Sequence, residues 1–361
     1  MINTIIIYII FNFIVLLICG KISYKLNLVD LPNKRKIHST ITAYTGGISI
    51  SIILLFAVIL FDNFNPSLSL ILSIGFLISI VGLIDDKYTL NIGGKLSLQI
   101  IPIFYLIVIQ NFYLNHLGDY YYFKLELGTF ALPFTLNQIG DYGFFNIDLG
   151  AFTIPFTFLS VLFLINSFNY FDGIDGMLGC TSISVLAILY FLASENNNHI
   201  LVTEQNIKLF IIVIIIPIAV FLFFNFSFLN LPKLFLGDGG SLLLGFIISF
   251  ILIYFANKNF IHPILLAWSV VIFVYEFLSI NIIRLKNNQG LFKAGKDHLH
   301  HILIRKTKSV FLTNFIMTTV NISLFSVGYY SLLLINELAS LIMFIVFFIF
   351  FLIIRDIFSK K

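Results

Sequence analysis

The feature that most constrains this chain is a series of apolar runs, each close to the length of a membrane-spanning helix, which takes roughly 20 apolar residues. Only 11% of the 361 residues are charged, against roughly 25% in a soluble domain. The sequence therefore predicts an all-α polytopic membrane protein that forms a single integral membrane domain over residues 1–361. We count about eleven transmembrane runs: Ile2–Gly20, Gly46–Phe61, Leu68–Ile84, Leu96–Leu114, Phe152–Ile165, Met177–Leu192, Ile207–Phe228, Ser241–Ala256, Pro263–Ile283, Phe311–Leu334 and Ala339–Ile354.

The distribution of Lys and Arg predicts the orientation of these runs. Cytoplasmic loops of membrane proteins carry an excess of basic residues. With eleven crossings and a periplasmic N-terminus, all but three of the 21 basic residues fall on the cytoplasmic side, the exceptions being Lys124, Lys208 and Lys258. We therefore expect every polar motif described below to lie on the cytoplasmic face.

The stretch Asn166–Gly176 joins two apolar runs and carries the densest set of polar side chains. Asn166, Asn169, Asp172 and Asp175 recur at every third residue, so neighbours in this series would share one side of a helix. Two carboxylates and two carboxamides form a hard-oxygen site, which suits Mg²⁺ held together with substrate phosphates. The alternative is a polar turn whose acids face water.

Two further acidic motifs also lie next to apolar runs. Asp85 and Asp86 end an apolar run, where adjacent carboxylates are costly unless paired or bound to metal. The alternative for this pair is a helix stop signal. Asp238 lies in a Gly-Asp-Gly-Gly-Ser sequence, whose backbone N–H groups could face a phosphate.

Basic residues and histidines gather near the C-terminal third of the chain. His298, His300 and His301 share a loop with seven basic residues, and cations there would suit a pyrophosphate or a lipid phosphate. A zinc site is the alternative, but neither a Cys nor a nearby fourth ligand supports it. The basic residues are Arg284, Lys286, Lys293, Lys296, Arg305, Lys306 and Lys308.

The long segment between the fourth and fifth runs contains an internal repeat. Leu127–Thr135 resembles Leu149–Thr157, 22 residues later, and both segments are β-prone. We expect a short periplasmic β-hairpin or small sheet packed on the outer surface, with chance similarity in a biased composition as the alternative.

Together these motifs, in this order from Asp30 to His301, resemble those of the polyprenyl-phosphate N-acetylhexosamine-1-phosphate transferases, which belong to glycosyltransferase family 4. The His-x-His-His form at His298–His301 is closer to the bacterial undecaprenyl-phosphate GlcNAc-1-phosphate transferases than to the phospho-MurNAc-pentapeptide transferase. The resemblance implies an inner-membrane enzyme of cell-envelope or lipopolysaccharide biosynthesis. It would transfer GlcNAc-1-phosphate from UDP-GlcNAc to undecaprenyl phosphate and release UMP.

The resemblance also implies roles for individual residues. Asp172 and Asp238 would hold or adjoin Mg²⁺, with Mn²⁺ as an alternative. Asp85 and Asp86 would act as the base or orient the lipid phosphate, and covalent attack by an aspartate stays open. The implied substrate-binding residues are Lys36, His38, Lys95, Asn166, Asn169, Asp175, Arg284, His298, His300 and His301.

Three positions depart from the family pattern. The family often has Pro where Ala43 stands, Asp where Gly295 stands, and Asp where Glu276 stands near the end of the ninth run. The loop near the last two is thought to read the sugar, so N-acetylfucosamine and MurNAc-pentapeptide remain alternative sugars.

Another class of function is a secondary transporter, which also places acids among many spans. A transporter would carry its acids in mid-membrane, whereas these lie at one face. The expected partners are a UDP-N-acetylhexosamine, undecaprenyl phosphate and membrane lipid, with a homodimer possible and no nucleic acid.

Overall fold

The computed structural model describes the chain apart from residues 1, 32–40, 62–63, 124–135, 140–141, 196–200, 289, 291–297 and 360–361. It is predominantly helical, as the sequence predicts. The helices are α1 (Ile2–Lys25), α2 (Gly46–Leu60), α3 (Pro66–Tyr88), α4 (Ile92–Phe104), α5 (Thr153–Phe171), α6 (Met177–Glu195), α7 (Leu201–Asn225), α8 (Gly237–Asn257), α9 (Pro263–Ser269), α10 (Val271–Lys286), α11 (Leu299–Thr307), α12 (Val310–Leu334) and α13 (Glu337–Ser359). A π-helical turn, Tyr105–Ile109, extends α4, and short 3₁₀ turns lie at Gly150–Phe152 and Phe228–Asn230.

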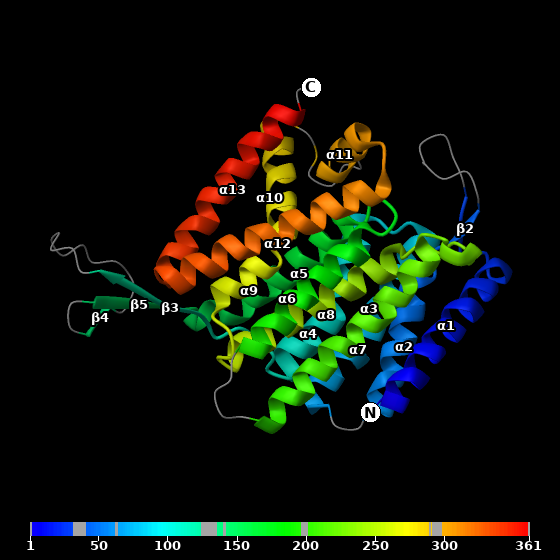
Figure 1. The fold of residues 1–361 in the computed structure, drawn as a ribbon, viewed down its shortest axis with the longest axis horizontal. Coiled ribbons are helices and arrows are strands. Elements are labelled where there is room, and N and C mark those ends of the chain that lie inside the picture. The colour runs from blue at the N-terminus through cyan, green and yellow to red at the C-terminus, as the bar shows by residue number, and fades with distance from the viewer. Residues whose placement is uncertain are drawn as a thin grey trace.

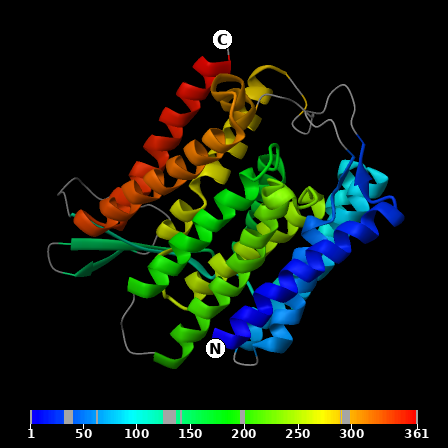
Figure 2. The ribbon, with the colours of Figure 1, turned by 45° about the vertical axis from the view of Figure 1, so that its right-hand side comes forward.

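Helix α8 is the centre of the bundle. Its most apolar window is 94% buried, and it packs most extensively on α3 and α5. Figures 1 and 2 show α1 along one flank of the bundle and α12 and α13 along the other. One cluster of buried apolar residues runs through the bundle from Tyr8 to Phe325, so the two flanks share a continuous core.

The helices match the predicted apolar runs in place, though not always in length. Within the described residues, nine helices are long and apolar enough to cross a membrane, or ten if α9 and α10 form one span with a 73° bend. The remaining predicted crossing corresponds to α2, which is apolar but has only 15 residues. The count of eleven crossings therefore stays a prediction.

The bend between α9 and α10 is stabilised by a side chain from α12. Asn321 is fully buried; its Oδ1 accepts from the backbone N–H of Ile272 at 3.4 Å, and its Nδ2 donates to Ser269 O at 3.4 Å. Because a helix break leaves backbone groups without partners, Asn321 makes the bend tolerable inside an apolar bundle.

A small antiparallel sheet projects from the bundle in the order β3 (His116–Phe123), β5 (Tyr142–Asp148) and β4 (Leu136–Ile139) (Figure 1). Strand β3 contacts α9 and α13. A sheet in this part of the chain was predicted, whereas its side of the membrane stays a prediction. Of the repeat, Leu127–Thr135 lies outside the described residues. The second copy is not a strand, because Thr153 already begins α5 and the packing of that helix outweighs local β propensity.

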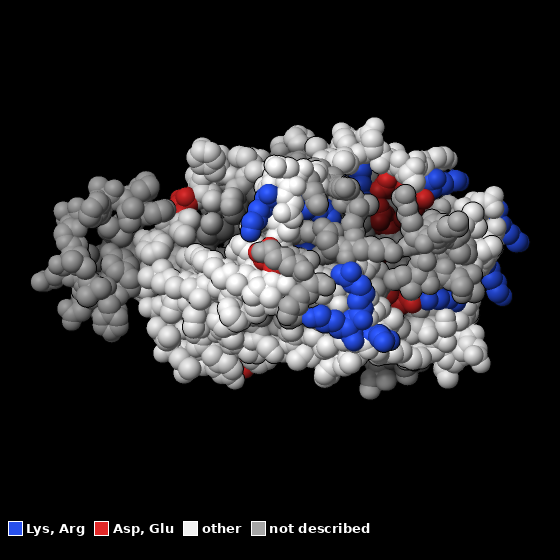
Figure 3. Space-filling model, turned by 90° about the horizontal axis from the view of Figure 1, so that it is seen from above, with Lys and Arg blue, Asp and Glu red and all other residues white. Residues whose placement is uncertain are grey.

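The segments that carry the predicted motifs meet at one end of the bundle. In Figure 1 this end carries β2 (Thr42–Ala43), α11 and the C-terminus, while the N-terminus lies at the opposite end. Strand β2 pairs with β1 (Val29–Asp30). Seen from above in Figure 3, Lys and Arg side chains are spread over this end, and acidic side chains lie in a hollow among them.

Candidate active site

A cavity of about 880 Å³ opens at this end of the bundle, a volume suited to a substrate of small-molecule size. It is formed by the end of α3, the turn after α5, the start of α8 and part of α11. Backbone bonds hold its rim: Phe235 N donates to Ala43 O at 2.8 Å, and Gly47 N donates to Leu236 O at 2.8 Å. The segments preceding α2 and α8 are therefore joined beside the cavity.

Five predicted acids line this cavity: Asp85, Asp86, Asp172, Asp175 and Asp238. The first two lie in the last turn of α3, and Asp238 lies in the first turn of α8. The two helices touch at Gly82, where an added Cβ would lie 2.4 Å from the carbonyl carbon of Asp238. A side chain at position 82 would separate the helices, so this glycine brings the acids of α3 beside Asp238.

Lys95 joins two of these acids. Its Nζ lies 2.7 Å from Asp85 Oδ2 and 2.6 Å from Asp238 Oδ2. A tight connection between helices places it there: Asp85 Oδ1 accepts from Leu90 N at 2.9 Å, and Asn91 caps α4 through Gly94 N. Lys95 thus places one positive charge between two carboxylates that would otherwise repel each other.

Asn169 completes this network from α5. Its Nδ2 donates to Asp238 Oδ1 and to Ser241 Oγ, both at 2.9 Å, and its Oδ1 accepts from Lys95 at 3.3 Å. Both oxygens of Asp238 therefore have donors. Two residues that the resemblance implies for substrate binding, Asn169 and Lys95, thus contact Asp238 directly.

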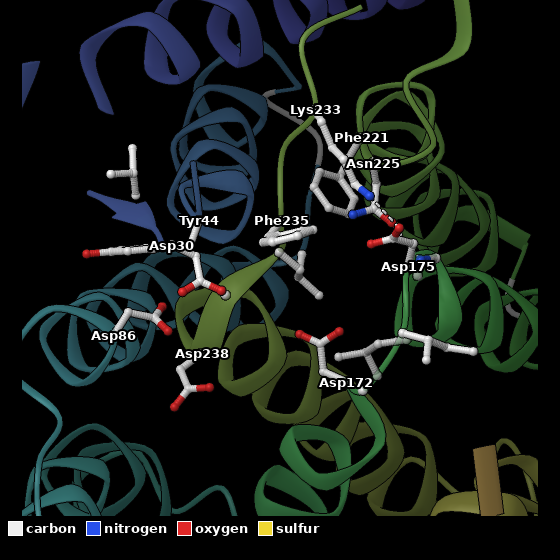
Figure 4. Close-up of a pocket in the computed structure, with 18 of the residues that line it drawn as sticks. Asp30, Tyr44, Asp86, Asp172, Asp175, Phe221, Asn225, Lys233, Phe235 and Asp238 are labelled. Carbon is white, nitrogen blue, oxygen red and sulfur yellow. Dashed lines mark hydrogen bonds and ion pairs between the residues drawn. The ribbon is translucent and has the colours of Figure 1, made fainter. Parts of the chain in front are cut away.

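Asp86 and Asp172 differ from Asp85 and Asp238, because no lysine or arginine pairs with them among the described residues. The Asp86 side chain accepts a 3.4 Å hydrogen bond from Gly239 N. Burial, with smaller effects of Asp238 and Asp175, raises the pKa of Asp172 to about 8. Figure 4 shows Asp86 and Asp172 in the cavity on different elements, α3 and the turn after α5.

These residues fit a divalent cation that is completed by substrate. No group of three His, Cys, Asp or Glu side chains among the described residues forms a ready metal site. Mg²⁺ is usually held by one or two carboxylates with water and substrate phosphates. Two carboxylates that face one cavity, without a basic partner among the described residues, meet that requirement.

The Asn166–Gly176 series is only partly helical, which corrects the prediction. Helix α5 ends at Phe171, and Asp172 has non-helical backbone angles, φ −81° and ψ 66°. Asp172 and Asp175 therefore lie in a turn, where they reach the cavity. Asn166, still in the helix, donates to Leu162 O at 2.7 Å and does not line the cavity.

The far wall of the cavity contains residues that the sequence reasoning missed. Lys233 Nζ lies 2.6 Å from Asp175 Oδ2, and Asn225 accepts from Gly176 N at 2.5 Å while donating to Leu234 O. The rings of Phe221 and Phe235 lie beside them (Figure 4). Lys233 and Phe235 sit near the Gly-Asp-Gly motif in sequence, which was the available signal.

The three histidines occupy different environments at the start of α11, which is a helix where a loop was predicted. His301 lines the cavity. His298 is largely buried, with Nδ1 3.5 Å from Glu276 Oε1. His300 is fully buried, and burial, followed by the charges of His301 and His298, lowers its pKa to about 3. His300 therefore does not reach the cavity, contrary to its predicted contact with the sugar nucleotide.

Another predicted residue, Arg284, does not line the cavity. Arg284 is 2% exposed, and its guanidinium lies 5.9 Å from the centre of the Tyr170 ring. A long basic side chain in this apolar helix packs inward on an aromatic face. Lys36 and His38 lie outside the described residues, as does Gly295.

Comparisons with known proteins agree on one family. The model of glycosyl transferase family 4 matches residues 68–256, more than half of the chain. The undecaprenyl-phosphate alpha-N-acetylglucosaminyl 1-phosphate transferase of Yersinia pestis is 27% identical over 311 residues, 84% of this chain and 77% of the relative. The protein of the same name in Escherichia coli K12 is 25% identical, covering 82% and 74%. A Bacillus subtilis protein named as a probable undecaprenyl-phosphate N-acetylglucosaminyl 1-phosphate transferase is 27% identical, covering 80% and 72%.

Proposed function

This chain belongs to glycosyl transferase family 4, and from that premise we propose that it transfers GlcNAc-1-phosphate from UDP-GlcNAc to undecaprenyl phosphate. An oxygen of the lipid phosphate attacks the β-phosphorus of the nucleotide sugar and forms a diphosphate bond. The bond from that phosphorus to the bridging oxygen breaks, and UMP leaves. The observation that supports this most is the convergence of five acids and Lys233 on one cavity, with Lys95 paired to two of those acids.

The chemistry of the cavity suits phosphoryl transfer, which depends on positioning and on neutralising phosphate charge. Lys95 and Lys233 are each paired with aspartates that line the cavity. Their ammonium groups can orient phosphates once the substrate competes for them. The ring of Phe235, which lines the cavity beside Lys233, offers an aromatic surface for a nucleobase, so we assign the nucleotide to the wall near Asp175.

We assign different roles to the adjacent acids Asp85 and Asp86. Asp85 accepts from Lys95 and from Leu90 N, which makes its carboxylate an anchor for Lys95. Asp86 has no such cation among the described residues. We assign Asp86 to accept the proton of the lipid phosphate, or to orient that phosphate, and Asp85 to hold Lys95 in place.

Mg²⁺, or Mn²⁺ in its place, is the cofactor that these residues fit. Asp172 and Asp238 would hold it, as the resemblance implies, with Asp86 a further carboxylate within the cavity. When bound, the ion would neutralise negative charge on the transferring phosphate. Because Asp238 already interacts with Lys95 and Asn169, Asp172 is the carboxylate most available to the metal ion.

The test is transfer by purified protein in detergent. Radiolabelled UDP-GlcNAc and undecaprenyl phosphate should yield labelled lipid with Mg²⁺ and none with EDTA. Asp172→Asn should lose at least 100-fold in rate, whereas Asp356→Asn, on α13 outside the cavity, should match wild type. Unlabelled UDP-N-acetylfucosamine and UDP-MurNAc-pentapeptide, added as competitors, decide the sugar. Full activity of Asp172→Asn at saturating Mg²⁺ would remove Asp172 from the metal site.

A further inference from the structure

A buried ion pair joins the last helix to α10. Arg355 on α13 and Glu276 on α10 are each 2% exposed, and Arg355 Nη1 lies 2.7 Å from Glu276 Oε2. The same nitrogen donates to Glu276 O at 3.0 Å and contacts Ser279 Oγ. Charges inside a membrane bundle are costly unless they are paired. Arg355 directly follows an apolar run. Because both residues are buried and paired, neither acts as a surface charge at the end of a span.

The other oxygen of Glu276 holds the start of α11. Its Oε1 accepts from the backbone N–H of Leu299 at 2.9 Å and lies 3.5 Å from His298 Nδ1. His298 is the residue preceding the helix, and its side chain makes no capping bond. A carboxylate that accepts from a first-turn N–H replaces such a cap and also favours the helix dipole.

The start of α11 in turn touches the acidic turn of the cavity. His300 packs on Gly173, where an added Cβ would lie only 1.9 Å from His300 Nε2. Gly173 follows Asp172 directly, and one residue further along α11 His301 lines the cavity. A shift of the first turn of α11 would therefore move both His301 and the turn that carries Asp172.

We propose that Glu276 and Arg355 are positioning residues that fix the first turn of α11, and through it His301 and the Asp172 turn, for binding of the nucleotide sugar. The C-terminal helix thus takes part in building the cavity, although it does not line it. The role of His301 in binding the nucleotide sugar rests on the proposed function; the tether between Arg355, Glu276 and Leu299 does not.

The first test measures the tether without any transfer assay. Hydrogen exchange followed by mass spectrometry should show exchange in the 298–307 peptide at least tenfold faster in Glu276→Gln than in wild type, with α8 peptides unchanged. Because Glu276→Gln leaves Arg355 buried without its partner and could unfold the protein, the neutral double variant Glu276→Gln, Arg355→Met is measured as well. Lys286→Ala is the matched control, since Lys286 joins α10 to α13 through an exposed 3.6 Å pair with Asp356.

The second test measures the coupling to His301. Glu276→Gln, or the neutral double variant, should raise KM for UDP-GlcNAc at least fivefold more than it lowers kcat. The same change in a His301→Ala background should add less than twofold, because residues that act through one another are not additive. Unchanged exchange in the 298–307 peptide, or full additivity with His301→Ala, would overturn the proposal. If wild type transfers no sugar phosphate, the proposed function fails while the exchange test still decides the tether.

Discussion

Burial of His300 makes a quantitative prediction about acid stability. The pKa of His300 is lowered to about 3 by burial and by its histidine neighbours, whereas an unfolded chain protonates histidine near pH ~6.5. The native state therefore excludes a proton that the unfolded state binds. Stability is complete above about pH 6.5 and is lost as the pH falls toward 3. Replacing His300 with Gln removes the titrating group and should remove this loss.

The size of the effect follows from that difference in pKa. Each pH unit below the unfolded pKa costs ~1.4 kcal/mol, so lowering the pH from 7 to 5 should cost the wild type about 2 kcal/mol through His300 alone. Other groups titrate in both proteins and cancel in the comparison. His300→Gln should accordingly lose about 2 kcal/mol less than wild type over this interval.

The assay is denaturant unfolding in mixed micelles at pH 7, 6 and 5, with free energies compared between the two proteins. A second variant, His116→Gln, controls for loss of a histidine elsewhere, on β3. Parallel pH dependence of wild type and His300→Gln would refute the reasoning. It would mean that His300 either protonates in the native state or becomes exposed without unfolding.

Three further predictions concern the cavity and the topology. Lys95→Met leaves Asp85 and Asp238 without their shared cation, so we expect transfer to fall at least 100-fold in the lipid-extraction assay; a loss below tenfold would contradict this. Asp86→Asn should lower kcat by ~10²- to 10⁴-fold with little change in KM for UDP-GlcNAc, and steady-state kinetics would show the reverse if Asp86 only bound the donor. A reporter fused after Lys361 should read cytoplasmic and one inserted near Gln138 external; a cytoplasmic signal near Gln138 would overturn the predicted orientation.

The convergence of the acids could be predicted from sequence because it depends on topology. Once basic residues assign loops to a face, Asp85, Asp172 and Asp238 must share that face, and the structure brings them to one cavity. The family resemblance also placed Lys95 and Asn169 in the site, and in the structure both contact Asp238. These were inferences about which loops meet, and they did not need side-chain detail.

Features set by packing could not be predicted in the same way. A three-residue period cannot show that α5 stops at Phe171, because the end of the helix depends on the turn that Gly173 and Gly176 permit. Neither can a His-x-His-His sequence show that His300 is buried while His301 faces the cavity. Charged residues within or beside apolar runs did indicate buried pairing. Glu276 and Arg355 each needed a partner, and the sequence alone did not say which.

Helix α8 shows that a helix can be long and apolar enough to cross a membrane and still contact protein instead of lipid. Lipid chains are fluid and fill gaps, so lipid-facing positions such as Ile349 on α13, which is 51% exposed, should accept most apolar residues. Helix α8 meets protein on nearly every side, and at Gly245 an added Cβ would lie 2.8 Å from Ile165 Cα. Tolerance to substitution along α8 should therefore follow side-chain volume, as in the core of a water-soluble enzyme. Among variants of this chain, α8 should be the apolar helix in which one apolar residue least readily replaces another.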